Sequence, residues 1–158
     1  MFFDFFGCVG QKVDCVFFLL FLKNRYLCSE EKGYMEQKRT TPEFITSLKP
    51  NEVFVFGSNL SGMHGGGAAY IAYRKFGAIM GQGVGLQGQS YGIPTMQGGV
   101  ETIRPYVDDF IEFAQQHPEL TFLVTRIGCG IAGFRDEEIA PLFKEAHGVQ
   151  NIVLPKGW

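Results

Sequence analysis

The sequence predicts an α/β protein, a three-layer α/β/α sandwich built on a mostly parallel, mixed sheet. From residue 41 onward, apolar runs typical of strands alternate with segments of helical periodicity, the order that gives a parallel sheet covered by helices. The apolar, β-rich run at 120–127 is typical of a strand buried on both faces. Glycine-rich loops follow two strand-like runs, at 57–67 and at 128–134.

The first elements are predicted from capping and apolar patterns. A Thr-Pro-Glu sequence opens residues 41–48 and resembles an N-cap with proline at the first helical position, which predicts a short helix. Residues 52–56 form a buried-strand run that ends at a glycine. After the first glycine loop, residues 68–76 are predicted to form a helix whose alanines permit close packing.

The later elements follow the same alternation. Residues 81–88 are predicted to be an irregular loop that leads into a Tyr-Gly-Ile-Pro sequence. Apolar residues at helical spacing predict an amphipathic helix over 101–116. Acidic residues at 136–138 open another helix, and Pro141 makes its extent uncertain. Residues 151–154 are the last predicted strand.

Residues 1–34 differ in character from the rest and are interpreted as an N-terminal hydrophobic extension to a domain at 35–158. Its apolar run at 16–22 is far shorter than the ~20 residues that span a bilayer. Three interpretations remain: an added strand, a poor membrane anchor, or a mis-assigned start codon, which we favour. No chemistry is assigned to this extension.

Composition and charge exclude several classes of function. An apolar fraction of 46% and a charged fraction of 19% are typical of a globular protein, not of a disordered one. A net charge of −2 with scattered basic residues argues against a nucleic-acid-binding surface. The cysteines form no C-x-x-C pair, so we expect neither a metal site nor a cofactor. Free thiols favour a cytoplasmic protein. No membrane partner is expected, and the sequence leaves the oligomeric state open.

The first glycine loop combines a Ser-Asn pair at a strand end with three glycines at a helix start. Glycine lets backbone N–H groups approach a ligand, and a helix N-terminus attracts an anion, most often a phosphate. The amide of Asn59 suits a ribose hydroxyl, although a tight turn with a structural asparagine is the alternative. The candidate ligand-binding residues here are Gly57, Ser58, Asn59, Gly65, Gly66 and Gly67. Asn59 and His64 are the candidate catalytic residues, a solvated loop histidine being the alternative for His64.

The second glycine loop matches G-x-G-x-x-G between a strand and a helix. A Rossmann unit also needs an acidic residue at the end of the next strand, where this chain has Pro155 and Lys156. Residues 83–88 match the same pattern, so the match has little specificity. The loop thus supports phosphate binding but not a Rossmann dehydrogenase. Its candidate ligand-binding residues are Gly128, Cys129, Gly130, Ile131, Ala132, Gly133 and Phe134.

Other polar residues near the loops have two interpretations each. Cys129 is an activated thiolate at a helix start or, as we favour in the absence of a histidine base, a small packed residue. Arg126 faces the ligand or, as we favour, pairs with a carboxylate such as Asp108 or Asp109. Three more residues recognise a base or ribose, or else satisfy loop backbone groups: Gln87, Gln89 and Tyr91.

Together these loops resemble those of the macrodomain superfamily, which binds ADP-ribose. Residues 55–59 are similar to the family's V-N-A-A-N, with Asn59 at the asparagine that contacts ribose. Residues 65–67 resemble its triple-glycine helix start, and residues 127–134 resemble the I-G-T-G-I-x-G-F/Y loop that wraps the diphosphate. The resemblance covers roughly 52–154 and is closest to a little-characterised branch from bacteria and their phages.

The resemblance implies a macro-like fold that binds ADP-ribose or a related nucleotide diphosphate, with Phe134 covering the distal sugar. The hydrolytic macrodomains of one class carry an acidic residue where this chain has Ala68 and Ala69, and the paired glutamates of another class are also missing. The family's adenine-binding aspartate has no match before Glu52. ADP-ribosyl hydrolysis therefore stays open. The alternatives are an enzyme on another phosphorylated nucleoside or sugar, with Cys129 as nucleophile, and a structural or partner-binding module.

Overall fold

A computed structural model of the protein describes residues 39–158, so the predicted extension at 1–34 lies outside the described residues. The strands are β1 (Thr40–Thr41), β2 (Glu52–Ser58), β3 (Gly85–Gln87), β4 (Ser90–Pro94), β5 (Thr121–Val124) and β6 (Ile152–Pro155). The helices are α2 (Gly67–Lys75), α3 (Val100–Gln116), α4 (Asp136–Ile139) and the 3₁₀-helix η1 (Ala140–Gly148).

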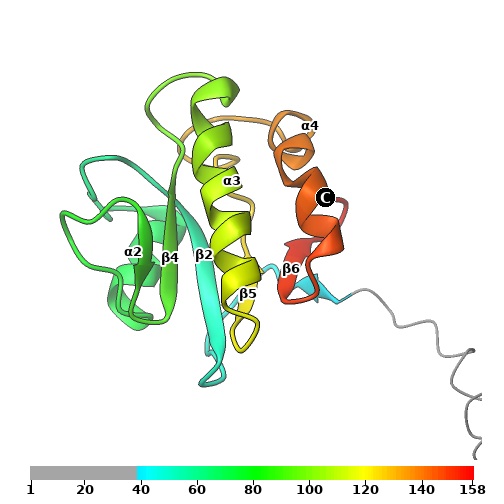
Figure 1. Cartoon of the computed structure of the whole chain (residues 1–158). Coiled ribbons are helices and arrows are strands. Elements are labelled where there is room, and N and C mark those ends of the chain that lie inside the picture. Colours follow the sequence, from blue (N-terminus) through cyan, green and yellow to red (C-terminus); the bar gives the residue numbers. More distant parts are fainter. Residues whose placement is uncertain (1–38) are drawn as a thin grey trace, which may run out of the picture. The chain divides into compact units, whose positions relative to one another are not determined.

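The six strands form one sheet in the order β1-β6-β5-β2-β4-β3 (Figure 1). Every neighbouring pair is parallel except β3 and β4. The predicted α/β fold with a mostly parallel, mixed sheet is therefore confirmed. Within residues 39–158, no helix has the length and hydrophobicity needed to cross a lipid bilayer.

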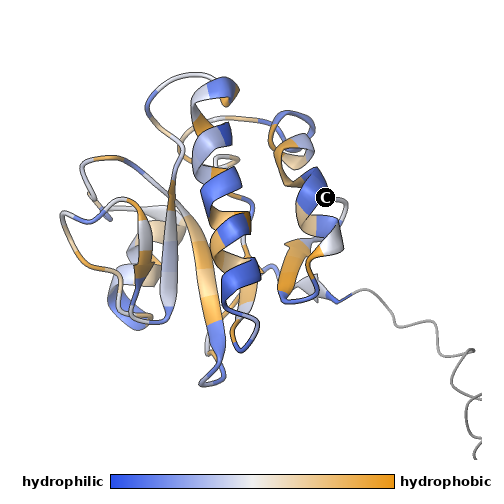
Figure 2. Ribbon diagram, in the orientation of Figure 1, coloured by the Kyte–Doolittle hydropathy of each residue, from blue (hydrophilic) through white to orange (hydrophobic). Residues whose placement is uncertain are grey.

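Strand β2 lies at the centre of the sheet and divides its side chains between two apolar cores. Val53 and Val55 pack into the core beneath α3, whereas Phe54 and Phe56 pack against α2 on the other face. Because successive side chains of a strand point to opposite faces, a strand covered on both faces is apolar throughout. Figure 2 shows this apolar colouring along β2.

Helix α3 confirms the predicted amphipathic helix. Its buried residues recur at helical spacing along one stripe: Ile103, Val107, Phe110, Ile111 and Ala114. Helix α2 buries only Ala69 and Ala72, small residues that suit close packing on the sheet.

The predicted helix at 41–48 is wrong. Thr40 and Thr41 instead form β1, which pairs with Leu154 and Pro155 of β6, and no helix follows at 42–48. The Thr41 hydroxyl donates a hydrogen bond of 2.7 Å to the Val153 carbonyl. The pairing of β1 with a strand more than a hundred residues away thus outweighs the local preference of the Thr-Pro-Glu sequence for a helix start.

Three other boundaries differ from the prediction. The irregular loop at 81–88 contains β3, which pairs antiparallel with β4. Strand β5 ends at Val124 because the chain turns there, with the Ile127 amide donating to the Thr125 carbonyl. The last helix changes from α to 3₁₀ at Ala140, since Pro141 has no N–H to continue the α-helical pattern.

Candidate functional site

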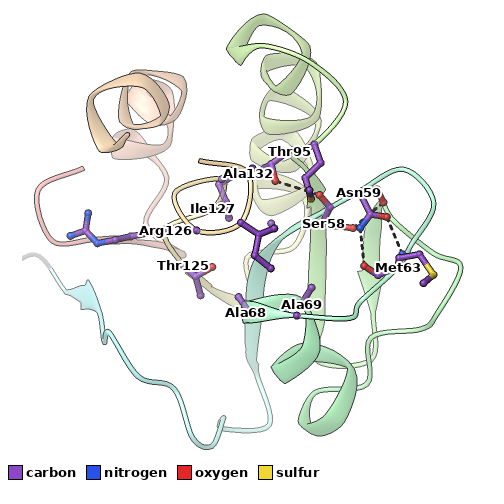
Figure 3. A pocket seen from close by; sticks show the side chains of 17 residues that line it. Ser58, Asn59, Met63, Ala68, Ala69, Thr95, Thr125, Arg126, Ile127 and Ala132 are labelled. Carbon is purple, nitrogen blue, oxygen red and sulfur yellow. Dashed lines mark hydrogen bonds between the residues drawn. The ribbon is translucent and has the colours of Figure 1, made fainter. Parts of the chain in front are cut away.

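Both glycine loops line one cavity of about 180 Å³ beyond the carboxyl ends of β2, β4 and β5 (Figure 3). In open α/β sheets this is the edge where ligands bind. Most of the predicted ligand-binding residues line it: Gly57, Ser58, Asn59, Gly66, Gly67, Gly128, Gly130, Ile131 and Ala132. Seven further lining residues were not predicted as site residues: Met63, Ala68, Ala69, Thr95, Met96, Thr125 and Ile127. Arg126 also lines the cavity, for which contact with the ligand was the less favoured of two interpretations.

One wall of the cavity is the amino end of α2. The N-cap residue Gly66 provides no side-chain cap, and the first turn carries no acidic residue. The N–H groups of Gly67, Ala68 and Ala69 have no partner within the helix, because a helix leaves its first N–H groups unpaired. The wall therefore presents unpaired donors and the positive end of the helix dipole.

The opposite wall is the second glycine loop. The Gly133 and Phe134 amides donate to the Gly130 and Gly128 carbonyls at 3.0 Å each, which folds the loop back on itself. Three consecutive N–H groups then have no acceptor among residues 39–158, those of Gly130, Ile131 and Ala132. Successive unpaired N–H groups in a turn form a concave site for anions.

Gly57 allows the second glycine loop to approach the end of β2 closely. A Cβ atom built at this position would lie 3.1 Å from the Gly128 amide nitrogen and 3.2 Å from the Thr95 hydroxyl oxygen. Both contacts are tighter than ordinary van der Waals packing, so a side chain here would push the second loop away from β2.

The Asn59 side chain fastens the loop at 59–63 through its amide. Its Nδ2 donates to the Met63 carbonyl at 2.8 Å, and its Oδ1 accepts from the Met63 amide at 2.9 Å and the Ser61 hydroxyl at 2.7 Å. The alternative of a structural asparagine in a turn thus describes most of its hydrogen bonds. The second Nδ2 hydrogen has no acceptor among residues 39–158 and is the donor left for a ligand.

Replacing Asn59 by alanine is expected to lower the free energy of unfolding by about 1–2 kcal/mol, because three hydrogen bonds are lost. Ser61→Ala removes only one of the three and is expected to cost less than half as much. Urea denaturation of both variants checks the order, and equal losses would contradict the central role of the Asn59 amide.

Several predicted site residues lie away from the cavity. His64 is fully buried, and its Nε2 lies 3.0 Å and 3.1 Å from the carbonyl oxygens of Ile79 and Gln82. It therefore connects the first glycine loop to the segment 79–82 and is not placed as a base in the cavity. His64 therefore does not line the cavity, and neither does Phe134, which is partly buried against the core beneath α3.

Cys129 is likewise not placed as a nucleophile. Its side chain packs against the core beneath α3 and does not line the cavity. Burial raises the pKa of the Cys129 thiol, although the charge of Arg126 acts in the opposite direction. A raised pKa disfavours the thiolate that nucleophilic attack requires. Gly65 and Gly133 also lie outside the lining, although each is adjacent to residues that form it.

The polar residues with two interpretations are now assigned. Gln87 bonds the Ile79 amide and the Gln82 carbonyl, and Gln89 donates to the Lys49 carbonyl, so both satisfy loop backbone. Tyr91 packs in the core, where burial, with a smaller effect of Asp109, raises its pKa to about 12.

Arg126 forms the predicted ion pair, but with a different partner and at the surface. Its Nη1 contacts the Asp136 carboxylate rather than Asp108 or Asp109, and its Nη2 donates to the Lys156 carbonyl at 2.8 Å. Its side chain is 39% exposed, so it is not the buried charge that the sequence predicted. Figure 3 shows the guanidinium directed away from the middle of the cavity.

A second cavity of about 260 Å³ borders the first and shares Thr125 and Arg126 with it. It lies beyond the carboxyl ends of β1, β5 and β6. Its other lining residues are mainly apolar or charged: Thr41, Pro42, Glu43, Val124, Pro155 and Lys156.

The chemistry of the first cavity favours binding of an anion. Its lining side chains include no carboxylate, imidazole or thiol, and besides Arg126, whose guanidinium is directed away (Figure 3), its polar side chains are the hydroxyls of Ser58, Thr95 and Thr125 and the amide of Asn59. No cluster of potential metal ligands occurs among residues 39–158. Neither a family model, nor a curated protein, nor a solved structure matches this chain.

Proposed function

We propose that this protein is a macro-like domain that binds ADP-ribose or a related nucleotide diphosphate. The observation that carries the proposal is that two sets of unpaired N–H groups, at the start of α2 and in the second glycine loop, belong to residues that line the same cavity. Such donors bind phosphate oxygens without a basic side chain. This agrees with a chain of net charge −2.

The first cavity is too small to enclose a whole dinucleotide. Its 180 Å³ is below the roughly 300–1,000 Å³ of pockets that bury drug-sized ligands. The ligand therefore places its distal ribose and one phosphate in the first cavity, and its second phosphate lies at the border of the two cavities, where the ligand crosses Thr125 and Arg126. Its adenosine end lies at the second cavity, against the apolar surfaces of Pro42, Val124 and Pro155.

The function we propose is binding rather than hydrolysis. General acid–base catalysis needs a titratable side chain within hydrogen-bond reach of the reacting group. The lining of the first cavity offers none, and His64 and Cys129, the candidates from the sequence, are buried elsewhere or packed on the core. The alanines at 68 and 69 agree with this, since hydrolytic macrodomains of one class carry an acidic residue there.

Calorimetric titration with ADP-ribose, NAD and AMP tests this function. We expect ADP-ribose to release binding heat and to remain uncleaved during the titration, as followed by chromatography. AMP, which lacks the diphosphate and the distal ribose, is expected to bind much more weakly. If all three titrations are silent, the binding function is wrong and the glycines serve only close packing. Cleavage of ADP-ribosyl linkages would instead show that the site is catalytic.

A further inference from the structure

We propose that Arg126 is a specificity-determining residue, through which the site distinguishes a diphosphate ligand from a monophosphate. The inference rests on the proposed function, because it concerns how the ligand passes from the first cavity to the second. Arg126 and Thr125 are the residues shared by the two cavity linings, so a ligand that occupies both must cross them.

The guanidinium has donors to spare for a phosphate. A guanidinium carries five N–H groups, and here one contacts Asp136 and another donates to the Lys156 carbonyl. The remaining donors, on Nε and on both terminal nitrogens, have no acceptor among residues 39–158. A phosphate oxygen can therefore bind Arg126 without displacing either existing partner.

The two existing partners orient the guanidinium instead of stabilising the fold. The Arg126 and Asp136 side chains are 39% and 41% exposed, and ion pairs with such exposure contribute little to stability. Asp136 and the Lys156 carbonyl nevertheless fix the orientation of the planar Arg126 guanidinium at the border of the two cavities. A planar donor held in place recognises a phosphate with less loss of conformational freedom than a mobile cation does.

The two sets of N–H groups and the guanidinium then have separate tasks. The N–H groups hold the phosphate in the first cavity, whose interior the Arg126 guanidinium does not enter (Figure 3). The guanidinium contacts the second phosphate, where the ligand continues toward Lys156 and the second cavity. A monophosphate held by the N–H groups alone does not reach it.

Arg126→Gln tests the assignment, with Arg135→Gln as the matched control. Arg135 lies in the same region, pairs with Glu138, has a 76% exposed side chain and lines neither cavity. Arg126→Gln is expected to weaken ADP-ribose binding about 10-fold or more and ribose 5-phosphate binding less than about twofold. Arg135→Gln is expected to change both by less than about twofold, and Arg126→Lys to be intermediate, because lysine keeps the charge but not the fork.

The outcomes separate this inference from the proposed function. If the wild-type protein binds no ADP-ribose, the proposed function itself is wrong. If the wild type binds and Arg126→Gln binds equally well, or if Arg135→Gln loses as much affinity, only the role of Arg126 is wrong. Should Arg126→Gln fail to fold, Arg126→Lys is judged against Arg135→Gln by the same comparison. Should ribose 5-phosphate not bind the wild type, the role of Arg126 is judged only by the ADP-ribose affinities of the Arg126 variants and of Arg135→Gln.

Discussion

Replacing Gly130 by glutamate is expected to abolish ADP-ribose binding and to leave the fold intact. Gly130 lines the first cavity as the first residue of the unpaired N–H groups in the second glycine loop, and a Cβ atom at this position meets no atom within 4 Å. Its φ lies outside the left-handed region, so a side chain causes no backbone strain. The new carboxylate then occupies the place of the ligand phosphates and repels them, and like charges brought together cost several kcal/mol. We expect the affinity to fall about 100-fold or more.

Two further substitutions at Gly130 separate charge from bulk. Gly130→Ala adds a Cβ atom alone and is expected to change the affinity less than about threefold. Gly130→Gln has the size of glutamate without its charge and is expected to lie between the two. Thermal unfolding of the glutamate variant is expected at or slightly above the wild-type temperature, because a carboxylate near the start of α2 complements the helix dipole. Binding by Gly130→Glu as tight as by Gly130→Ala would contradict an anion site between the loops.

The parts of the fold that were predictable from sequence are those decided by local pattern. The apolar stripe of α3 and the two-faced apolar run of β2 are set by the spacing of their own residues. β1 was missed because its partner β6 lies at the far end of the chain. β3 was missed because a three-residue edge strand between glycines has no periodicity to detect.

For the candidate site, too, some features could be predicted from local sequence pattern and others could not. Backbone geometry was predictable, because glycines after strands mark where bare N–H groups approach a ligand, and both loops do line one cavity. Side-chain direction was not: His64 turns inward beneath its loop, and Phe134 packs on the core. Thr95 and Met96 were not predicted as site residues, because they lie outside the two glycine-rich loops from which the site was predicted. Their position directly after β4 was the available clue, since ligands bind at the carboxyl ends of parallel strands.

Replacing Gly83 by alanine is expected to destabilise the protein by about 3 kcal/mol, at the upper end of the usual cost of overpacking. Gly83 passes directly beneath the loop that Asn59 fastens. A Cβ atom at Gly83 would lie 2.0 Å from the Asn59 carbonyl oxygen and 3.2 Å from the Leu60 carbonyl carbon. These are backbone atoms, which cannot move aside as the end of a flexible side chain does. The Asn59 loop must shift, and ADP-ribose affinity is expected to fall with it.

Gly148 supplies the matched control for this substitution. It also lies at an ordinary φ, and a Cβ atom there meets nothing within 4 Å. Gly148→Ala is therefore expected to change the free energy of unfolding by less than about 1 kcal/mol, with a gain if the lower entropy of the unfolded chain dominates. Urea denaturation measures both variants, and ADP-ribose titration of the folded fraction measures the site. Equal denaturation midpoints for Gly83→Ala and the wild type would show that Gly83 does not approach Asn59. A destabilised Gly83→Ala with unchanged affinity would show instead that the Asn59 loop supports the fold but does not shape the site.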